Sequence, residues 1–185
     1  IAGIGVLRLQ AVGDATHEMS NRSLAKERLA AGWLLGTSTN SVRTYALLNT
    51  DDPQVQDYLQ KGMSKISVTI SETQKQLEEM LDSPEEIALV ADIKKKRADY
   101  IELRSMLLKL KAGGQHDEAM RIARDKLVPT LDSYDASIRA ILAHEQAQID
   151  KSADAIDALY RSGRVNLLVL AAIALALGSV LAWLL

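Results

Sequence analysis

The chain ends in a stretch of nineteen residues, LLVLAAIALALGSVLAWLL at positions 167–185, that contains no charged side chain. Wound as an α-helix at about 1.5 Å per residue, this stretch would reach roughly 28 Å, close to the thickness of the hydrocarbon core of a bilayer. A buried helix of a soluble protein is the alternative, but a terminal helix that is apolar on every side is typical of a membrane span. We therefore predict a transmembrane helix over residues 165–185.

The first ten residues, IAGIGVLRLQ, form a second apolar run that Arg8 interrupts. Alone, this run is too short to cross a bilayer. It is either the end of a first membrane helix or the beginning of a soluble one. Because the opposite end is so clearly apolar, we expect residues 1–11 to be the end of a first transmembrane helix.

The composition between these ends is typical of long helices. Of 185 residues, 22 are Lys or Arg and 24 are Asp or Glu, and the formal net charge of -2 gives no indication of a nucleic acid partner. The absence of Cys excludes disulfides, thiolate metal sites and a cysteine nucleophile. With only three Pro and ten Gly, most of the chain is free of helix breakers.

Two breaks in the middle of the chain carry helix start signals. The segment NTDDPQ offers Asp51 or Asp52 as an N-cap ahead of a proline. In the segment DSPEE, Ser83 is expected to be the N-cap and Glu86, three positions later, the partner that completes a capping box. Both breaks predict short turns between helices.

A third break, AGGQHDEA, offers Gly113 as a helix C-terminus and Asp117 as the next N-cap. The helices are therefore expected at about residues 12–49, 53–81, 84–112 and from 117 into the final span, with a kink at Pro129. Short turns favour antiparallel neighbours, so we predict an all-α, up-down-up-down four-helix bundle over residues 12–164, flanked by transmembrane segments.

The third helix has an unusual seam. Alternating spacings of three and four place these residues on one face: Val90, Ile93, Arg97, Tyr100, Arg104 and Leu107. Such a face is normally apolar, so two arginines and a tyrosine require partners inside the bundle. The lysines at positions 94–96 fall off the seam and are expected to be a solvated face.

Counting outward from the turns brings hydroxyl-rich segments of the other helices to the level of this seam. The segments are GTSTNSVR, SVT and PTLDSY. The candidate ligand-binding residues are Arg97, Tyr100, Arg104, Ser67 and Thr69, with Tyr134, Thr37, Asn40 and Arg43 closing the site.

Three interpretations of the arginines are open. Each could extend to solvent, as single arginines on seams often do. Both could pair with internal carboxylates, for which the candidates are Glu102, Asp99, Asp132 and Asp135. Alternatively, they could hold an external carboxylate in bidentate fashion. Arginines seven residues apart lie roughly 10 Å apart along a helix, which suits an anion with two separated carboxylates.

Signals of catalysis are missing from the sequence. A di-iron bundle needs Glu-x-x-His pairs, which do not occur, and HEQAQ lacks the second histidine of a zinc protease motif. There is no phosphate-binding loop and no dinucleotide fingerprint. We therefore expect no enzymatic activity, no cofactor and no metal site.

The whole layout resembles the extracytoplasmic sensor region of bacterial methyl-accepting chemotaxis proteins of the four-helix-bundle type. The likeness rests on the capping box at the second turn, on GGQHDEAMRIARDKLVPTLDSY before the last helix and on RSGRVNLLVLAAIALALGSVLAW. NSVRTYALL also looks like the Asn and Arg pattern that such receptors carry in their first helix.

This resemblance implies a periplasmic ligand-binding domain, usually dimeric, anchored in the inner membrane, with small displacements of its last helix transmitted through the second span. Receptors of this architecture include detectors of organic acids. The resulting hypothesis is a chemoreceptor sensor domain that binds a di- or tricarboxylate such as malate or citrate. The alternative is a membrane-anchored scaffold or partner-sensing domain, including a sensor-kinase input domain, without a small ligand.

Overall fold

The computed structural model describes residues 10, 12–14, 16 and 22–184 of the chain. Apart from position 10, the predicted end of a first membrane helix at residues 1–11 lies outside the described residues. The elements in chain order are α2 Leu24–Asn49, α3 Pro53–Met80, α4 Pro84–Ala112, α5 His116–Ile122, the π-helical segment η2 Ala123–Leu127, and α6 Val128–Leu184.

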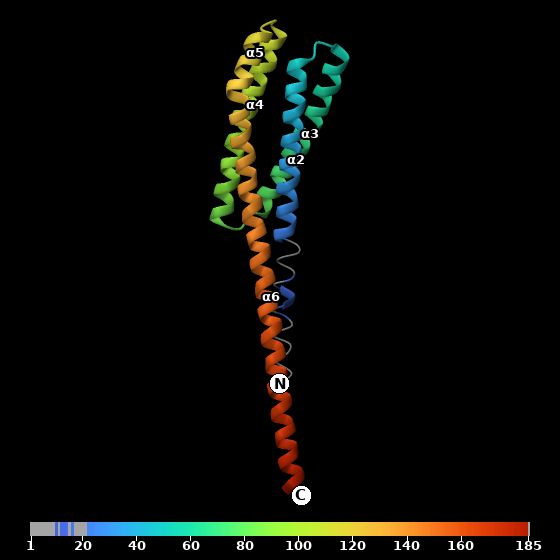
Figure 1. The fold of residues 1–185 in the computed structure, drawn as a ribbon, viewed down its shortest axis with the longest axis vertical. Coiled ribbons are helices and arrows are strands. Elements are labelled where there is room, and N and C mark those ends of the chain that lie inside the picture. Colours follow the sequence, from blue (N-terminus) through green and yellow to red (C-terminus); the bar gives the residue numbers. More distant parts are fainter. Residues whose placement is uncertain (1–9, 11, 15, 17–21, 185) are drawn as a thin grey trace. The chain divides into compact units, whose positions relative to one another are not determined.

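The chain forms two compact units, of which the first is Ala25–Gln146. In this unit α2, α3, α4 and the α5–α6 segment follow one another in alternating directions (Figure 1). The arrangement confirms the predicted all-α, up-down-up-down bundle. The proposed domain range of 12–164 stays a prediction.

The first two turns are built by the predicted caps. Asp52 precedes α3, and its Oδ1 accepts hydrogen bonds from the amides of Gln54 (2.8 Å) and Val55 (3.3 Å). Ser83 precedes α4, and its Oγ accepts from the amide of Glu86 at 3.1 Å. The Glu86 carboxylate accepts from the amide of Asp82 (2.9 Å), one residue before the N-cap. The capping box is therefore present in a form shifted by one residue.

The third turn ends α4 where predicted but begins the next helix at a different residue. Gly113 ends α4 as expected, and Gly114 follows with φ of 79°, a conformation that favours glycine. Asp117, however, is not the N-cap, because α5 begins at His116 after Gln115. The amide of Gln115 donates to the carbonyl of Leu110 (2.9 Å) and closes the end of α4, and the carbonyl of Gln115 accepts from the amide of Ala119 (3.0 Å), which starts α5.

The helix before Pro129 is distorted in a form that the sequence did not specify. The expectation was a kink, and the structure has a π-helical segment at residues 123–127 just before the proline. Pro129 has no N–H to donate to the carbonyl of Asp125, four residues earlier. A wider π-helical turn accommodates this missing hydrogen bond.

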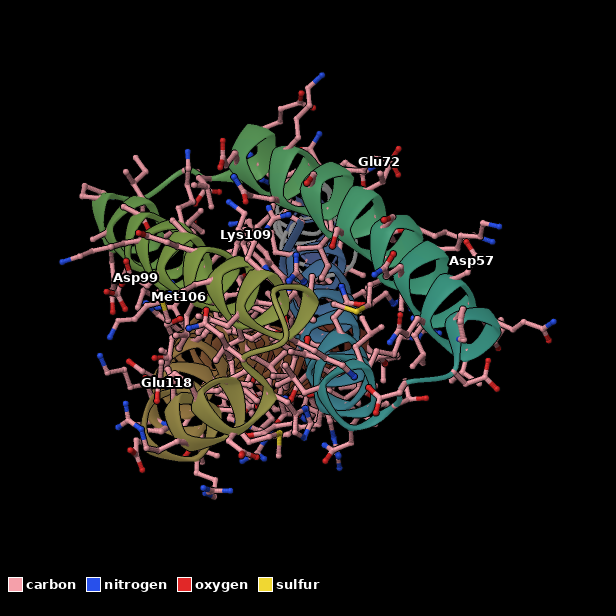
Figure 2. All side chains as sticks on the ribbon, turned by 90° about the horizontal axis from the view of Figure 1, so that it is seen from above. Asp57, Glu72, Asp99, Met106, Lys109 and Glu118 are labelled. Atoms are coloured by element: carbon pink, nitrogen blue, oxygen red, sulfur yellow. The ribbon has the colours of Figure 1, made fainter. Side chains whose placement is uncertain are left out.

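The core lies along the predicted seams. On α4, Val90, Ile93, Tyr100 and Leu107 are buried, whereas Arg97 and Arg104 are half-buried. The largest fully buried apolar side chains of the bundle are Trp33, Tyr134, Leu48, Leu77, Ile93, Leu107, Leu127, Ile138 and Ile141. Figure 2 shows charged side chains such as Asp57, Glu72 and Asp99 on the outer side of the helices.

Helices α2 and α3 approach each other closely at Gly36. A Cβ atom at this position would lie 2.9 Å from Cγ1 of Ile70 and 3.3 Å from Cγ2 of Ile66. The absence of a side chain therefore allows two apolar residues of α3 to pack against the backbone of α2. Gly36 is the first residue of the hydroxyl-rich segment GTSTNSVR of α2.

The second unit contains Ala147–Leu185 together with the described residues up to Leu24. The helical segment His116–Trp183 contains an 18-residue window of mean hydropathy 2.5, none of which is buried. Large apolar side chains near its end are exposed, including Leu175, Leu181 and Trp183. By length and composition this helix is a candidate membrane span.

Removing the N-cap of α4 tests the second turn. We expect Ser83→Ala to lower the free energy of unfolding by about 1 kcal/mol, because the amide of Glu86 loses its acceptor. The measurement is reversible denaturation of the full chain in detergent micelles. Ser105→Ala, at an exposed position inside α4, is the control and should change stability by a few tenths of a kcal/mol at most. Equal effects of the two substitutions would contradict the assigned cap.

Candidate functional site

Arg97 bridges α4 and α3. Its guanidinium donates to Oε1 of Gln74 (2.6 Å), to Oγ of Ser71 (2.8 Å) and to the carbonyl of Ser67 (3.3 Å). Its Cζ also lies 6.0 Å from the ring centroid of Trp33 on α2. All these partners are uncharged, so the side chain is held in place without a counter-ion.

Tyr100 lies at the centre of the predicted group. Its hydroxyl shares a hydrogen bond with Thr44 of α2 (3.2 Å), and its ring lies 5.9 Å from that of Tyr134 on α6. Cζ of Arg104 lies 5.5 Å from the centroid of the Tyr100 ring, close enough for a cation–π interaction. One buried tyrosine therefore contacts an arginine of its own helix and residues of two neighbouring helices.

Tyr134 connects α6 to α2. Its hydroxyl accepts a hydrogen bond of 2.5 Å from Nε1 of Trp33. Burial raises the pKa of Tyr134, although the hydroxyl of Thr37 and the indole of Trp33 act in the opposite direction. Oγ1 of Thr37 is itself buried without a hydrogen bond of good geometry. Below, the name polar layer is used for Trp33, Arg97, Tyr100, Arg104 and Tyr134.

The positive charge of the polar layer has no internal balance. Within residues 22–184, neither Arg97 nor Arg104 has a carboxylate within 4.0 Å. Burial lowers the pKa of Arg97, and the charge of Arg104 lowers it further, so the two cations repel each other. The internal carboxylates that the sequence offered as partners do not fill this role.

Two of those carboxylates border a different surface. Asp99 and Glu102 line an open cavity of about 1070 Å³ on α4 that includes none of the predicted site residues. Asp132 is exposed, and burial raises the pKa of Asp135, one of whose oxygens has no hydrogen-bond partner. These positions leave the arginines without a counter-ion from the described part of the chain.

Ser67 lies between two cavities that are open to solvent. One, of about 460 Å³, is bordered by Arg97, and its other lining residues are Ser67, Val68, Ser71, Glu72 and Lys75. The other, of about 470 Å³, is bordered by Arg104 and lined by Leu47, Gln60, Met63, Ser64, Ser67 and Leu108. Both fall within the usual size range of small-molecule sites, about 300–1,000 Å³.

The remaining predicted residues divide into two groups. Asn40 belongs with Ser67, because its Nδ2 donates to Oγ of Ser67 (3.2 Å), and its buried Oδ1 has no partner. Thr69 is exposed and donates to the carbonyl of Lys65 in its own helix. Arg43 donates to the carbonyl of Gly62 (3.2 Å). The structure thus brings Asn40 close to the polar layer, because Ser67 contacts both Asn40 and Arg97. Arg43, which contacts the backbone of α3, and Thr69, which is exposed, are not hydrogen-bonded to the polar layer within the described part of the chain.

A second charged group, which the sequence analysis missed, lies near the turn between α3 and α4. Nζ of Lys26 donates to Oε1 of Glu86 at 2.7 Å and lies 3.3 Å from Oδ1 of Asp82 and 4.0 Å from Oε1 of Glu145. Lys26, Glu86 and Glu145 are buried, with at most 3% of each residue exposed. Below, the name Lys26 cluster is used for Lys26, Asp82, Glu86, His144 and Glu145.

The two buried glutamates differ in their surroundings. Burial alone would raise the pKa of Glu86, but hydrogen bonds from Lys26 and from the amide of Asp82 outweigh it and lower the pKa to about 2. Among the residues that the structure describes, no group donates a hydrogen bond to either oxygen of Glu145. Burial raises the pKa of Glu145 to about 7, with Lys26 acting against this and Glu86 adding to it.

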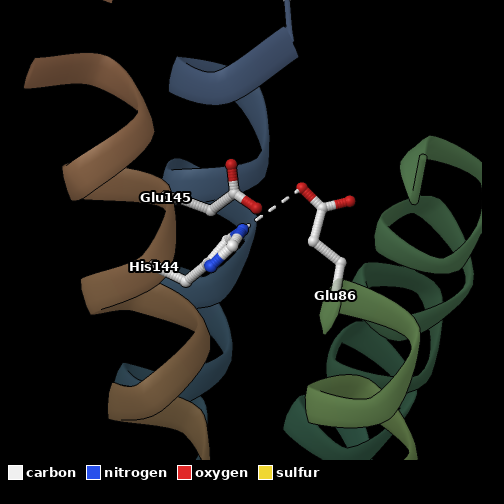
Figure 3. A group of neighbouring side chains, drawn as sticks. All are labelled: Glu86, His144 and Glu145. Carbon is white, nitrogen blue, oxygen red and sulfur yellow. Dashed lines mark ion pairs between the residues drawn. The ribbon is translucent and has the colours of Figure 1, made fainter. Parts of the chain in front are cut away.

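Glu86, His144 and Glu145 point toward one another (Figure 3), and their ligand-type atoms lie within 4.8 Å. By residue type such a trio could hold a metal ion. However, the ammonium of Lys26 already lies against Glu86 at 2.7 Å and faces Glu145. A lysine in that place supplies the cation, so we assign the cluster as an ion-pair network.

A signal in the sequence could have located the Lys26 cluster. Lys26 precedes Ala30 and Trp33 at helical spacing, and Glu145 follows Ile138 and Ile141 in the same way. A charged residue on an apolar seam was the criterion that singled out Arg97 and Arg104. The same criterion, applied to α2 and α6, would have found both members.

Comparison with known proteins identifies the sequence class. A family model described as a four-helix bundle sensory module for signal transduction matches residues 1–160. No match is found among curated proteins. The matched range includes both the polar layer and the Lys26 cluster.

Replacement of the Tyr134 hydroxyl tests the link between α6 and α2. We expect Tyr134→Phe to destabilise the chain by about 1–3 kcal/mol, because the buried N–H of Trp33 loses its acceptor. Chemical denaturation followed by Trp fluorescence measures this change. Tyr58→Phe, at a position that is 72% exposed, is the matched control and should have no measurable effect. A neutral Tyr134→Phe would mean that the hydrogen bond contributes nothing to stability.

Removal of the ammonium of Lys26 tests the ion-pair network. We expect Lys26→Met to destabilise the bundle by about 3–5 kcal/mol, since the buried carboxylate of Glu86 is left without its cation. Lys75→Met, which removes a surface lysine paired with Glu79, should cost well under about 1 kcal/mol. Thermal unfolding of the two variants side by side provides the comparison. Similar melting temperatures would rule out a structural role for Lys26.

Proposed function

The chain belongs to the family of four-helix-bundle sensory modules of chemoreceptors, and from this premise we propose that it detects a small organic acid. The proposed ligand is a di- or tricarboxylate such as malate or citrate. The family is a signal-transduction module rather than a catalytic domain, and we expect no enzymatic activity and no cofactor.

The observation that carries this proposal is the unbalanced charge of Arg97 and Arg104. Both are half-buried in a bundle, and neither has a carboxylate partner among the described residues. Keeping two cations in such a place costs free energy unless an anion is bound. A ligand with two carboxylates would relieve the cost at both positions, because arginine binds a carboxylate with two parallel hydrogen bonds.

Contacts around the arginines suggest how the ligand would be held. Arg104 borders the cavity of about 470 Å³, and Arg97 borders the neighbouring one, with Ser67 between them. We propose that each arginine binds one carboxylate and that the Ser67 hydroxyl and Tyr100 donate to remaining oxygens. The further proposed contacts are Asn40, Thr37, Tyr134 and Arg43, and Thr69, which is exposed, would contribute only after a rotation of α3.

Binding at this place would change the contacts of α6. Tyr134 of α6 touches both Trp33 and Tyr100, so a ligand that moves Tyr100 alters the packing of α6 in the bundle. α6 is a single helix of 57 residues that includes the candidate membrane span. We propose that a small displacement of α6 is the signal. The family and the candidate span support membrane association. We further propose that the chain is anchored in the inner membrane, that residues 12–164 lie in the periplasm and that the chain forms a homodimer.

One observation favours the alternative, a scaffold or partner-sensing domain without a small ligand. Arg97 already donates three hydrogen bonds to neutral groups on α3. A bundle could use these bonds simply to hold α3 against α4. In that case added acids would leave its stability unchanged, whereas a ligand at a hundred times its dissociation constant would stabilise it by about 2.7 kcal/mol.

Isothermal titration with malate, citrate and succinate distinguishes the two functions. We expect at least one acid to bind the full chain, and Arg97→Ala and Arg104→Ala each to weaken binding by about 10- to 100-fold, because a charge-assisted hydrogen bond is lost. Arg121→Ala, at an exposed arginine paired with Glu118, is the control and should bind like the parent. Absence of heat with all three acids, or unchanged affinity in both arginine variants, would support the scaffold.

A further inference from the structure

Glu145 is a buried carboxyl group to which no N–H or O–H of the described residues donates a hydrogen bond; the side chain closest to forming one is Glu86, and such a bond requires that one of the two carboxyls be protonated. Its residue is 0% exposed, and within the described part of the chain neither Oε1 nor Oε2 accepts a hydrogen bond. Buried carboxylates are normally paired or accept several hydrogen bonds, because an ionised group without them is costly. The side chain comes from α6 and points toward Glu86 of α4 (Figure 3).

Charges around Glu145 do not favour its ionised form. From α2 it faces Lys26, whose Nζ lies 4.0 Å from Oε1 but only 2.7 Å from Glu86 and 3.3 Å from Asp82. From α4 it faces Glu86, and Asp82 lies in the preceding turn. The neighbouring His144 contacts Glu86 and the exposed Glu85. The ammonium of Lys26 therefore lies closer to two other carboxylates than to that of Glu145.

We propose that Glu145 is a proton-binding site, so that the bundle has a proton as a second ligand. The site is separate from the proposed organic-acid site: Glu86 and Arg97 are eleven residues apart on α4, roughly 16 Å along the helix axis. The inference therefore stands whether or not an organic acid binds. With Glu145 protonated, the Lys26 cluster contains one ammonium and the carboxylates of Glu86 and Asp82.

Loss of the proton would place a second buried negative charge beside Glu86. The two carboxylates come from α6 and α4, so their repulsion acts directly on the packing of these helices. Tyr134 and Glu145 lie eleven residues apart on α6, which puts both the proton and the proposed organic acid in contact with the helix that carries the candidate membrane span. A pH change and a ligand would thus act on the same helix at two levels.

The pH range follows from the two pKa shifts. Glu145 has its pKa raised from 4.5 to about 7, so the folded state holds the proton more tightly and stability is lost as pH rises between these values. Glu86 has its pKa lowered to about 2, so its contribution is fully present above pH 4.5 and is lost only as pH falls toward 2. Between pH 4.5 and 7, therefore, the titration of Glu145 makes the free energy of unfolding depend on pH, whereas that of Glu86 does not.

Infrared spectroscopy of the full chain in detergent micelles tests the proton directly. We expect the carbonyl band of a protonated carboxyl to disappear with a midpoint near pH 7 in the parent and to be missing from Glu145→Gln. His144→Gln removes the neighbouring imidazole and should keep the band. A parent band that is constant from about pH 5 to about pH 9, or an identical change in Glu145→Gln, would overturn the proposal.

Thermal or chemical unfolding of the same proteins gives an independent readout. Relative to Glu145→Gln, the folded-to-unfolded ratio of the parent should fall by up to about tenfold per pH unit between pH 4.5 and 7, and then stay level. The comparison cancels the titration of surface groups, which both proteins share. Parallel pH profiles would overturn the proposal, and Glu145→Asp is the second variant if the glutamine protein does not fold.

Discussion

The ion pair between Lys26 and Glu86 is the interaction on which one end of the bundle depends. Nζ of Lys26 lies 2.7 Å from a carboxylate that also accepts from the amide of Asp82, so one glutamate joins α2, α4 and the turn before α4. Glu86 is at the same time the helix-start residue that Ser83 caps through its amide. Because Lys26 and Glu86 are buried, removal of the ammonium would leave the Glu86 carboxylate without its cation. Glu145 of α6 packs beside this ion pair, with its Oε1 4.0 Å from Nζ of Lys26.

The polar layer has the opposite character. The neutral members have neutral hydrogen-bond partners: Trp33 donates to Tyr134, and Tyr100 shares a hydrogen bond with Thr44 of α2. The cationic members are oriented by neutral acceptors and ring faces but have no counter-ion among the described residues. In this layer the hydrogen-bonding groups are already held in place, but the positive charge of the two arginines is not neutralised. Such an arrangement is suited to an anion, because the ligand supplies the negative charge. This contrast separates the polar layer from the Lys26 cluster, where excess negative charge is suited to a proton.

Local signals made much of the fold predictable. The cap at Ser83 and the helix end at Gly113 were identified, and the first cap was narrowed to Asp51 or Asp52, because each involves residues only a few positions apart. The inward direction of Arg97, Tyr100 and Arg104 followed from helical periodicity alone. Asp117 failed as an N-cap because the amide of Ala119 donates to the carbonyl of Gln115, so that Gln115 is the N-cap and α5 begins at His116. Thr69 failed to join the layer because counting along helices fixes a level but not which side of the helix faces inward.

By itself, the sequence determined that the chain is helical, where three turns lie, that one helix is apolar enough for a bilayer and that cations lie on an inner seam. Only the tertiary structure decided which groups these charges meet. For Arg97 the sequence left solvent, internal carboxylates and an external ligand open, and the guanidinium lies against Gln74, Ser71 and Trp33. Lys26 and Glu145 are 119 positions apart, yet their charged atoms are 4.0 Å apart. Such pairs depend on the relative rotation and height of packed helices, which no local pattern encodes.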